Sequence, residues 1–239
     1  MSAAVETAEA LARRLSAARG WRLVANSVHS VDVGMNDNKL CGHYRPPRLA
    51  SEVAGSVFII WEDGTVSRGR IDSKTLSRLP RDIELWRSLA YRDDDAAHIA
   101  ELTPPTQVEL FDPRVADIVT GDASPVFDAM SQIAAAARED GADVIDAGVG
   151  CSAVETVIAA SNGLWVKYPE TNVWCSWSID KTMSGIRLGR DRETLAGLSR
   201  AVSVAGQLAA AARMLPRDGP GIHWSNSARA RAFSAAMSA

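Results

Sequence analysis

The chain has 239 residues, 46% of them hydrophobic, and a formal net charge of −3. This length and composition allow one large domain or two small ones with a substantial core. The charges are mixed, with no long basic block and no apolar run near the roughly 20 residues that span a bilayer, so neither nucleic-acid nor membrane association is expected.

The first twenty residues predict an amphipathic helix and not an export signal. Charged residues interrupt the apolar core that a signal peptide needs, which predicts a cytoplasmic protein. Between residues 3 and 18 the apolar side chains follow one helical stripe, and Gly20 ends the helix. The stripe consists of Val5, Ala8, Leu11, Ala12 and Leu15.

The next part of the chain predicts strands. Residues 21–33 alternate roughly between apolar and polar side chains, and Asn36-Asp37-Asn38 indicates a turn, followed by an irregular linker around Pro46-Pro47. Two β-rich runs, residues 55–61 and 65–71, then flank Asp63-Gly64. An Asp-Gly pair in this position is a strong β-hairpin signal.

Helices are expected in the middle and at the end of the chain. Two short ones are predicted at residues 74–79 and 83–91, with Pro80 as the break, and residues 92–113 favour an extended surface segment. Asp122-Ala-Ser-Pro125 opens a helix over residues 124–140. The longest predicted helix covers residues 191–215, which carry leucine, valine and alanine at helical spacing.

A second, longer hairpin is predicted around Ser161-Asn162-Gly163. A strand over residues 142–147 leads into it, and its own strands are expected near residues 153–160 and 164–180. Asn-Gly supplies the positive φ angles of a type I′ or related tight turn.

Aromatic side chains crowd this hairpin. Trp165 and Tyr168 should point to opposite faces of the strand, as should Trp174 and Trp177, because side chains alternate along a strand. One of each pair can fill the core. The other can serve as an interface anchor for a partner or a peptide, although core packing and cross-strand pairing of all four is the simpler interpretation.

The cysteines and histidines are not expected to form a site. Cys41, Cys151 and Cys175 lack metal-ligand spacing and are expected to be buried thiols. A cross-strand pair between Cys151 and Cys175 is the alternative, which a reducing cytosol disfavours. The four histidines are scattered along the sequence.

The order of these features resembles a known family. Leu110-Phe-Asp-Pro113, a helix, a strand and a long Ser-Asn-Gly hairpin follow one another as in the amino-terminal domain of the TldD/PmbA (TldD/TldE) family of zinc metallopeptidases. The resemblance implies an α/β fold of the α+β type over residues 1–185, with a mixed or antiparallel sheet and the long hairpin packed against helices. A connecting helix and the vestigial start of a second domain would occupy residues 186–239.

The resemblance also implies a role without catalysis. In catalytic subunits of the family, a helix of the second domain carries the zinc-binding HExxxH motif. The corresponding residues 228–237 contain neither histidine nor glutamate, as in the TldE/PmbA-type subunit. The chain is therefore expected to hold no metal or cofactor and to act with a zinc-bearing TldD-like partner on unstructured peptides, including precursors of modified peptide natural products.

Two alternatives stay open at this point. The chain could be a stand-alone binding or scaffolding domain with no part in proteolysis, or a fragment of a longer subunit. If the second domain is missing, apolar side chains such as Ile222 and Trp224 would lack cover. These residues, together with the hairpin aromatics, are then predicted to contact a TldD-like subunit or a second copy of the chain.

Overall fold

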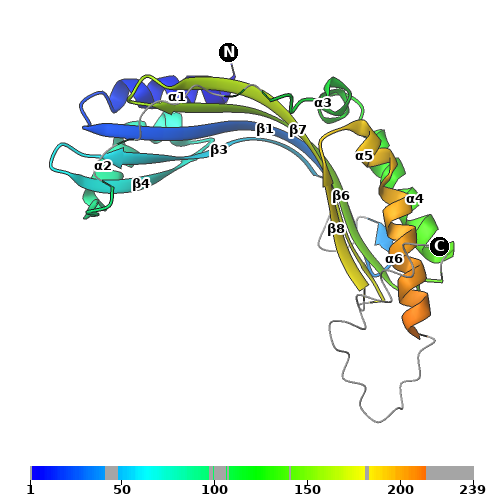
Figure 1. Ribbon diagram of the computed structural model, residues 1–239. Coiled ribbons are helices and arrows are strands. Elements are labelled where there is room, and N and C mark those ends of the chain that lie inside the picture. The colour runs from blue at the N-terminus through cyan, green and yellow to red at the C-terminus, as the bar shows by residue number, and fades with distance from the viewer. Residues whose placement is uncertain are drawn as a thin grey trace, which may run out of the picture.

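A computed structural model describes residues 2–40, 48–96, 99, 106, 108–139, 141–180 and 183–213. The strands form one curved antiparallel sheet, as Figure 1 shows, which confirms the α+β prediction. No helix among the described residues is long and apolar enough to cross a membrane.

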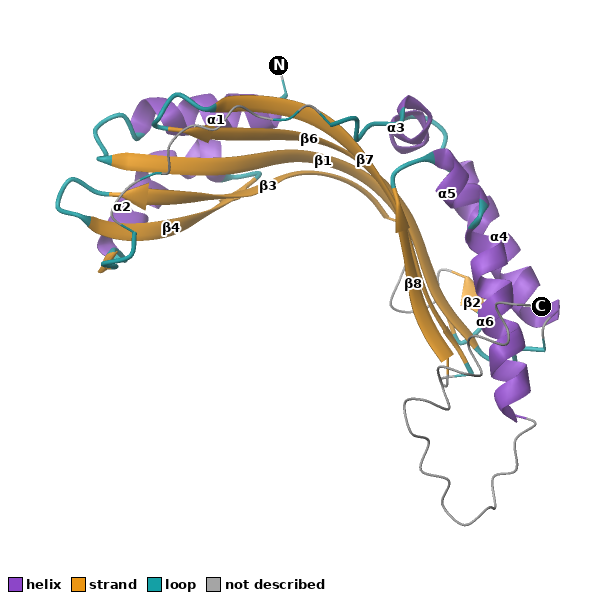
Figure 2. Ribbon diagram, viewed as in Figure 1, coloured by secondary structure: helices purple, strands orange, loops and turns teal. Residues whose placement is uncertain are grey.

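The sheet has the strand order β5-β4-β3-β1-β6-β7-β8, and β2 pairs with the end of β1. Every pair is antiparallel, and the long strands β1, β6 and β7 run through the whole bend of the sheet (Figure 2). The strands are β1 (Gly20–Asn36), β2 (Lys39–Leu40), β3 (Arg48–Ile60), β4 (Thr65–Asp72), β5 (Tyr91–Arg92), β6 (Ile145–Ala160), β7 (Trp165–Ile179) and β8 (Met183–Gly189).

The helices cover the outer, convex side of the bend in two groups (Figure 1). One group packs near the turn between β6 and β7, and the other covers the opposite half of these strands. The first consists of α1 (Ala3–Arg14) and α2 (Thr75–Ser88); the second consists of α3 (Pro113–Thr120), α4 (Ser124–Glu139), α5 (Arg192–Ala196) and α6 (Leu198–Arg213).

Each group of helices closes its own hydrophobic core. The odd-numbered side chains of β1 enter both cores: Leu23 lies in the first and Val33 in the second. Burying a leucine, isoleucine or valine stabilises the fold by about 1.5–3 kcal/mol. The first core also contains Leu11, Ile59, Ile71 and Trp86, and the second contains Met130, Ile133, Val149, Ile179 and Leu198.

Both predicted hairpins are present, and they share one turn geometry. Ala160 N donates to Leu164 O, and Gly163 N donates to Ala160 O; Trp61, Gly64 and Thr65 repeat this arrangement. Gly163 has a φ of +95°, whereas Asn162 is not among the residues with positive φ. The tight turn is confirmed, but it is a three-residue turn with a left-handed glycine and not type I′.

Several predicted helix boundaries were wrong. Residues 75–88 form one helix that includes Pro80. The proline ring costs this helix one main-chain hydrogen bond, and the burial of Leu79 and Trp86 on either side of the proline offsets that loss. The predicted helix over residues 191–215 is broken at Gly197, a residue with low helix propensity.

Other segments are more regular than predicted. The end of the predicted extended segment begins α3, with Asp112 as its N-cap and Pro113 in its first turn. β3 begins at Arg48, well before the predicted hairpin. Residues 142–147 and 153–160 were predicted as separate strands, but residues 145–160 form the single strand β6, and β8 was not predicted.

Replacing Gly163 by valine should destabilise the fold, because a β-branched residue resists a positive φ even though no atom lies near the added Cβ. The expected cost is about 1 kcal/mol or more in the free energy of unfolding. Denaturant unfolding measures it. Gly163→Asn is the control and should lose less, since asparagine tolerates this conformation; an equal loss in both variants would contradict this account of the turn.

Candidate functional site

The concave face of the sheet is the candidate functional site. It carries the even-numbered side chains of β1, while the described helices all pack on the face of the odd-numbered ones. In Figure 1 none of the described helices lies on the concave side of the bend. An antiparallel sheet can leave one face without cover, but large apolar side chains on that face call for an explanation.

The hairpin aromatics divide between the two faces, as alternation along a strand requires. Trp165 and Trp177 lie on the helical side, where Trp177 packs against the second core and Trp165 stays 45% exposed. Tyr168 and Trp174 lie on the concave face, half-buried, opposite Thr156 and Gly150 of β6. Of the four hairpin aromatics among the predicted binding residues, Tyr168 and Trp174 thus share this face.

Trp174 lies flat against the sheet because its neighbour on β6 is a glycine. A Cβ at Gly150 would come within 2.4 Å of the indole Nε1. The indole therefore occupies the space that a side chain at Gly150 would fill, and it covers the backbone there.

Two exposed aliphatic side chains of β8 lie beside Trp174. Leu188 pairs with Trp174 and Ile186 pairs with Ser176, so all three apolar residues share the concave face. Leu188 is 69% exposed and Ile186 is 66% exposed. We call Trp174, Ile186 and Leu188 the apolar strip.

Sequence reasoning missed Ile186 and Leu188, although a signal was present. Ser184-Gly-Ile-Arg-Leu188 places its apolar residues at alternate positions, which is the pattern of a strand with one apolar face. The predicted binding residues Ile222 and Trp224 lie outside the described residues.

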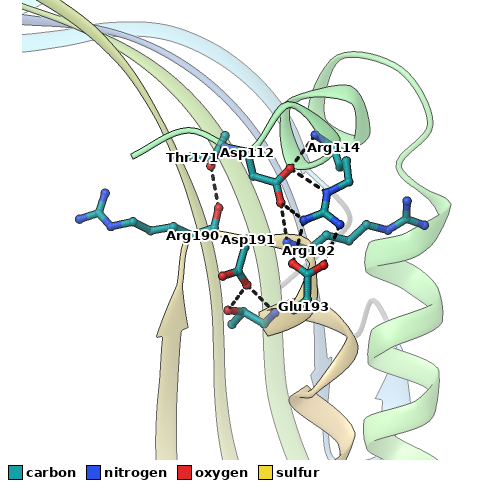
Figure 3. A network of polar contacts seen from close by, with 8 residues as sticks. Asp112, Arg114, Thr171, Arg190, Asp191, Arg192 and Glu193 are labelled. Atoms are coloured by element: carbon teal, nitrogen blue, oxygen red, sulfur yellow. Dashed lines mark hydrogen bonds and ion pairs between the residues drawn. The ribbon is translucent and has the colours of Figure 1, made fainter. Parts of the chain in front are cut away.

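A polar network holds the end of β8 in place (Figure 3). Asp112 caps α3 by accepting from the main-chain N–H of Arg114, and it also accepts from the N–H of Arg192 at 3.0 Å. The hydroxyl of Thr171 in β7 accepts from Asp112 N and donates to Arg190 O at 2.7 Å. These bonds join β7, α3 and the start of α5.

Arg114 adds a second link across the same junction. Its guanidinium donates to both carboxylate oxygens of Asp112 and, at 2.7 and 2.8 Å, to both oxygens of Glu193 (Figure 3). These hydrogen bonds hold the pKa of Asp112 well below its usual range and also lower the pKa of Glu193. Planar, bidentate contacts of this kind fix the relative orientation of the two charged groups and also strengthen their interaction.

The described residues offer no metal centre, since no group of three or more histidine, cysteine, aspartate or glutamate side chains forms among them. Cys151 and Cys175 are free and fully buried, and burial raises the pKa of each thiol to about 12. In the sheet register Cys151 pairs with Val173 and Cys175 with Val149, so the two cysteines are not direct cross-strand partners.

The fold is similar to that of proteins of known structure. No protein-family model and no curated protein matches the chain. Among solved structures, TldE from Thermococcus kodakarensis aligns with a TM-score of 0.62 and 14% identity over 85% of this chain and 47% of that one.

Two further structures were described as candidate modulators of DNA gyrase. The protein from Thermotoga maritima aligns with a TM-score of 0.53 and 15% identity, and covers 87% of this chain and 47% of its own. The protein from Bacteroides thetaiotaomicron aligns with a TM-score of 0.56 and 14% identity, over 83% and 47%. The chain thus has the fold of TldE and of these proteins, over about half of their length.

Replacing Asp112 by alanine should destabilise the protein by about 1–2 kcal/mol, the usual cost of losing an N-cap carboxylate. Because the folded pKa of Asp112 is depressed, its contribution is present above about pH 4 and is lost as the pH falls further. Denaturant unfolding of the wild type and of Asp112→Ala, at neutral and at acidic pH, should show a difference in the free energy of unfolding that becomes smaller at acidic pH. Asp117→Ala, an exposed position on the same helix, is the control and should show no such pattern.

Proposed function

We propose that this chain is a non-catalytic component of a TldD/TldE-type peptidase assembly, and that it binds a partner subunit or a peptide through the concave face of its sheet. The observation that carries this proposal is the exposed apolar strip on a sheet face that no described helix covers. The fold shared with TldE supports the choice of assembly.

The energetics favour a covered strip. A leucine or isoleucine that stays in water forgoes about 1.5–3 kcal/mol relative to full burial. Ile186 and Leu188 lie side by side with a half-buried tryptophan, and tryptophan is among the residue types that most often dominate binding energy at interfaces. A partner surface laid on the strip would bury all three residues together.

The chemistry in this proposal belongs to a partner. A TldD-like subunit would supply zinc on its HExxxH helix and cleave unstructured peptides in the cytoplasm, with precursors of modified peptide natural products as one substrate class. This chain would contribute surface and not ligands. If the strip instead serves a stand-alone binding domain, the same residues would act without any peptidase.

The apolar strip can be tested by Ile186→Ser/Leu188→Ser. Sedimentation of the wild-type protein with a co-expressed HExxxH-bearing TldD-type subunit should show a heavier species that the double variant loses, because the variant removes the exposed apolar contact. Leu49→Ser/Leu89→Ser is the matched control, since these residues are 73% and 65% exposed elsewhere, and should retain the complex. A wild-type protein that never forms the heavier species would contradict the assembly and favour the stand-alone domain.

The isolated chain is predicted to bind no stoichiometric zinc and to have no peptidase activity, since its sequence lacks HExxxH. Metal analysis of protein purified without chelator decides this point, with the TldD-type subunit as the positive control. One tightly bound zinc per chain would contradict the non-catalytic role.

A further inference from the structure

The end of the concave face farthest from the apolar strip carries three exposed arginines, and a fourth lies beside them on a helix of the opposite face. Arg22 lies on β1, Arg68 and Arg70 lie on β4, and Arg81 lies on α2. We call these residues the arginine cluster. About 30 Å of strand separates it from Trp174, at roughly 3.3 Å per residue.

Two of these arginines are held by an aromatic ring. In the register, Phe58 of β3 lies between Arg22 on one side and Arg68 on the other. The guanidinium carbons lie 5.5 and 6.0 Å from the ring centre, which is the range of cation–π contacts. The ring orients both positive groups without neutralising either.

No ion pair to any arginine of the cluster occurs among the residues that the structure describes. Other described arginines form ion pairs with acids: Arg78 pairs with Asp72 and Arg87 pairs with Asp63 in the same half of the molecule, and Arg114 pairs with Asp112 in the other half. The whole chain has more acidic than basic residues, with 29 against 26. Four arginines without an ion pair among the described residues, three of them on one face and the fourth beside Arg70, are therefore a local excess of positive charge.

Arg70 and Arg81 also line a hollow of about 360 Å³ beside β4. The charged residues of its wall are three arginines and two aspartates. Arg78 lies 2.9 Å from Asp72 and 3.6 Å from Asp82, so one arginine already serves both acids. Arg70 and Arg81 remain as the donors available to a ligand, next to the half-exposed Leu85.

We propose that the arginine cluster binds the carboxylates of an acidic polypeptide segment. Guanidinium groups bind carboxylates with two parallel hydrogen bonds. Arg68 and Arg70 are alternate residues of one strand, so their Cα atoms lie about 6.5 Å apart, which is also the spacing of alternate side chains in an extended peptide. A segment with acidic residues at alternate positions therefore fits the two arginines.

Nucleic acid fits the cluster less well. Stacking of bases on exposed aromatic rings is a main source of single-strand affinity, and the ring of Phe58 is already engaged by two guanidinium groups. The net charge of −3 also opposes a polyanion beyond the cluster itself. An acidic peptide needs only the few arginines that are present.

Fluorescence anisotropy of the full chain with a labelled peptide that alternates glutamate and serine tests this site. Binding should weaken as salt rises. The affinity for the peptide should fall by about tenfold or more in Arg68→Gln/Arg70→Gln and in Arg81→Gln, while the thermal stability of these variants stays unchanged. The matched control is Arg138→Gln/Arg187→Gln, which removes two exposed arginines outside the cluster and should bind as the wild type does.

Three results would overturn the proposal: no binding of the acidic peptide, equal binding by the cluster variants and the control, or tighter binding of a single-stranded oligonucleotide. A lysine–serine peptide serves as the charge-reversed probe and should not bind. The experiment uses the chain alone and leaves the apolar strip intact. A failure to bind the acidic peptide would therefore not contradict the proposed docking of a partner on the strip, and a failure of that docking would not contradict the peptide site.

Discussion

The pairing of β1 with β6 is the constraint on which the rest of the structure depends. The two strands stay in one register from Arg22 opposite Ala160 to Met35 opposite Ala147, through the whole bend of the sheet. Because side chains alternate along a strand, this register places the odd-numbered residues of β1 under both groups of helices. A slip by one residue would empty both cores and bury Arg22 at the same time.

The two ends of the concave face are built by different means. At one end, a glycine on β6 makes room for Trp174, and the junction of Asp112, Arg114 and Glu193 anchors the strand that carries Leu188. At the other end, a phenylalanine ring orients arginines that lie on strands either side of it. A single surface can in this way present apolar contact and positive charge to one extended partner.

Local sequence signals predicted the elements that short-range chemistry determines. Gly64 and Gly163 marked both hairpin turns, and the apolar face of residues 124–140 marked α4. The signals failed where tertiary packing decides, as at Pro80, whose helix survives between two buried side chains. The site was harder to predict, since Arg22 and Arg68 meet only because β1 and β4 flank β3, and no local pattern states which strands become neighbours.

The strand order also has a kinetic consequence. β1 lies early in the chain and β6 lies after α4, yet they form the central pair of the sheet. Pairing between segments so distant in sequence requires a long loop to close first, and proteins rich in such contacts fold slowly. Until β6 arrives, one edge of the long strand β1 lacks its partner, and an unpaired edge can recruit another chain. During synthesis β6 is not complete as a partner for that edge until residue 160 has left the ribosome.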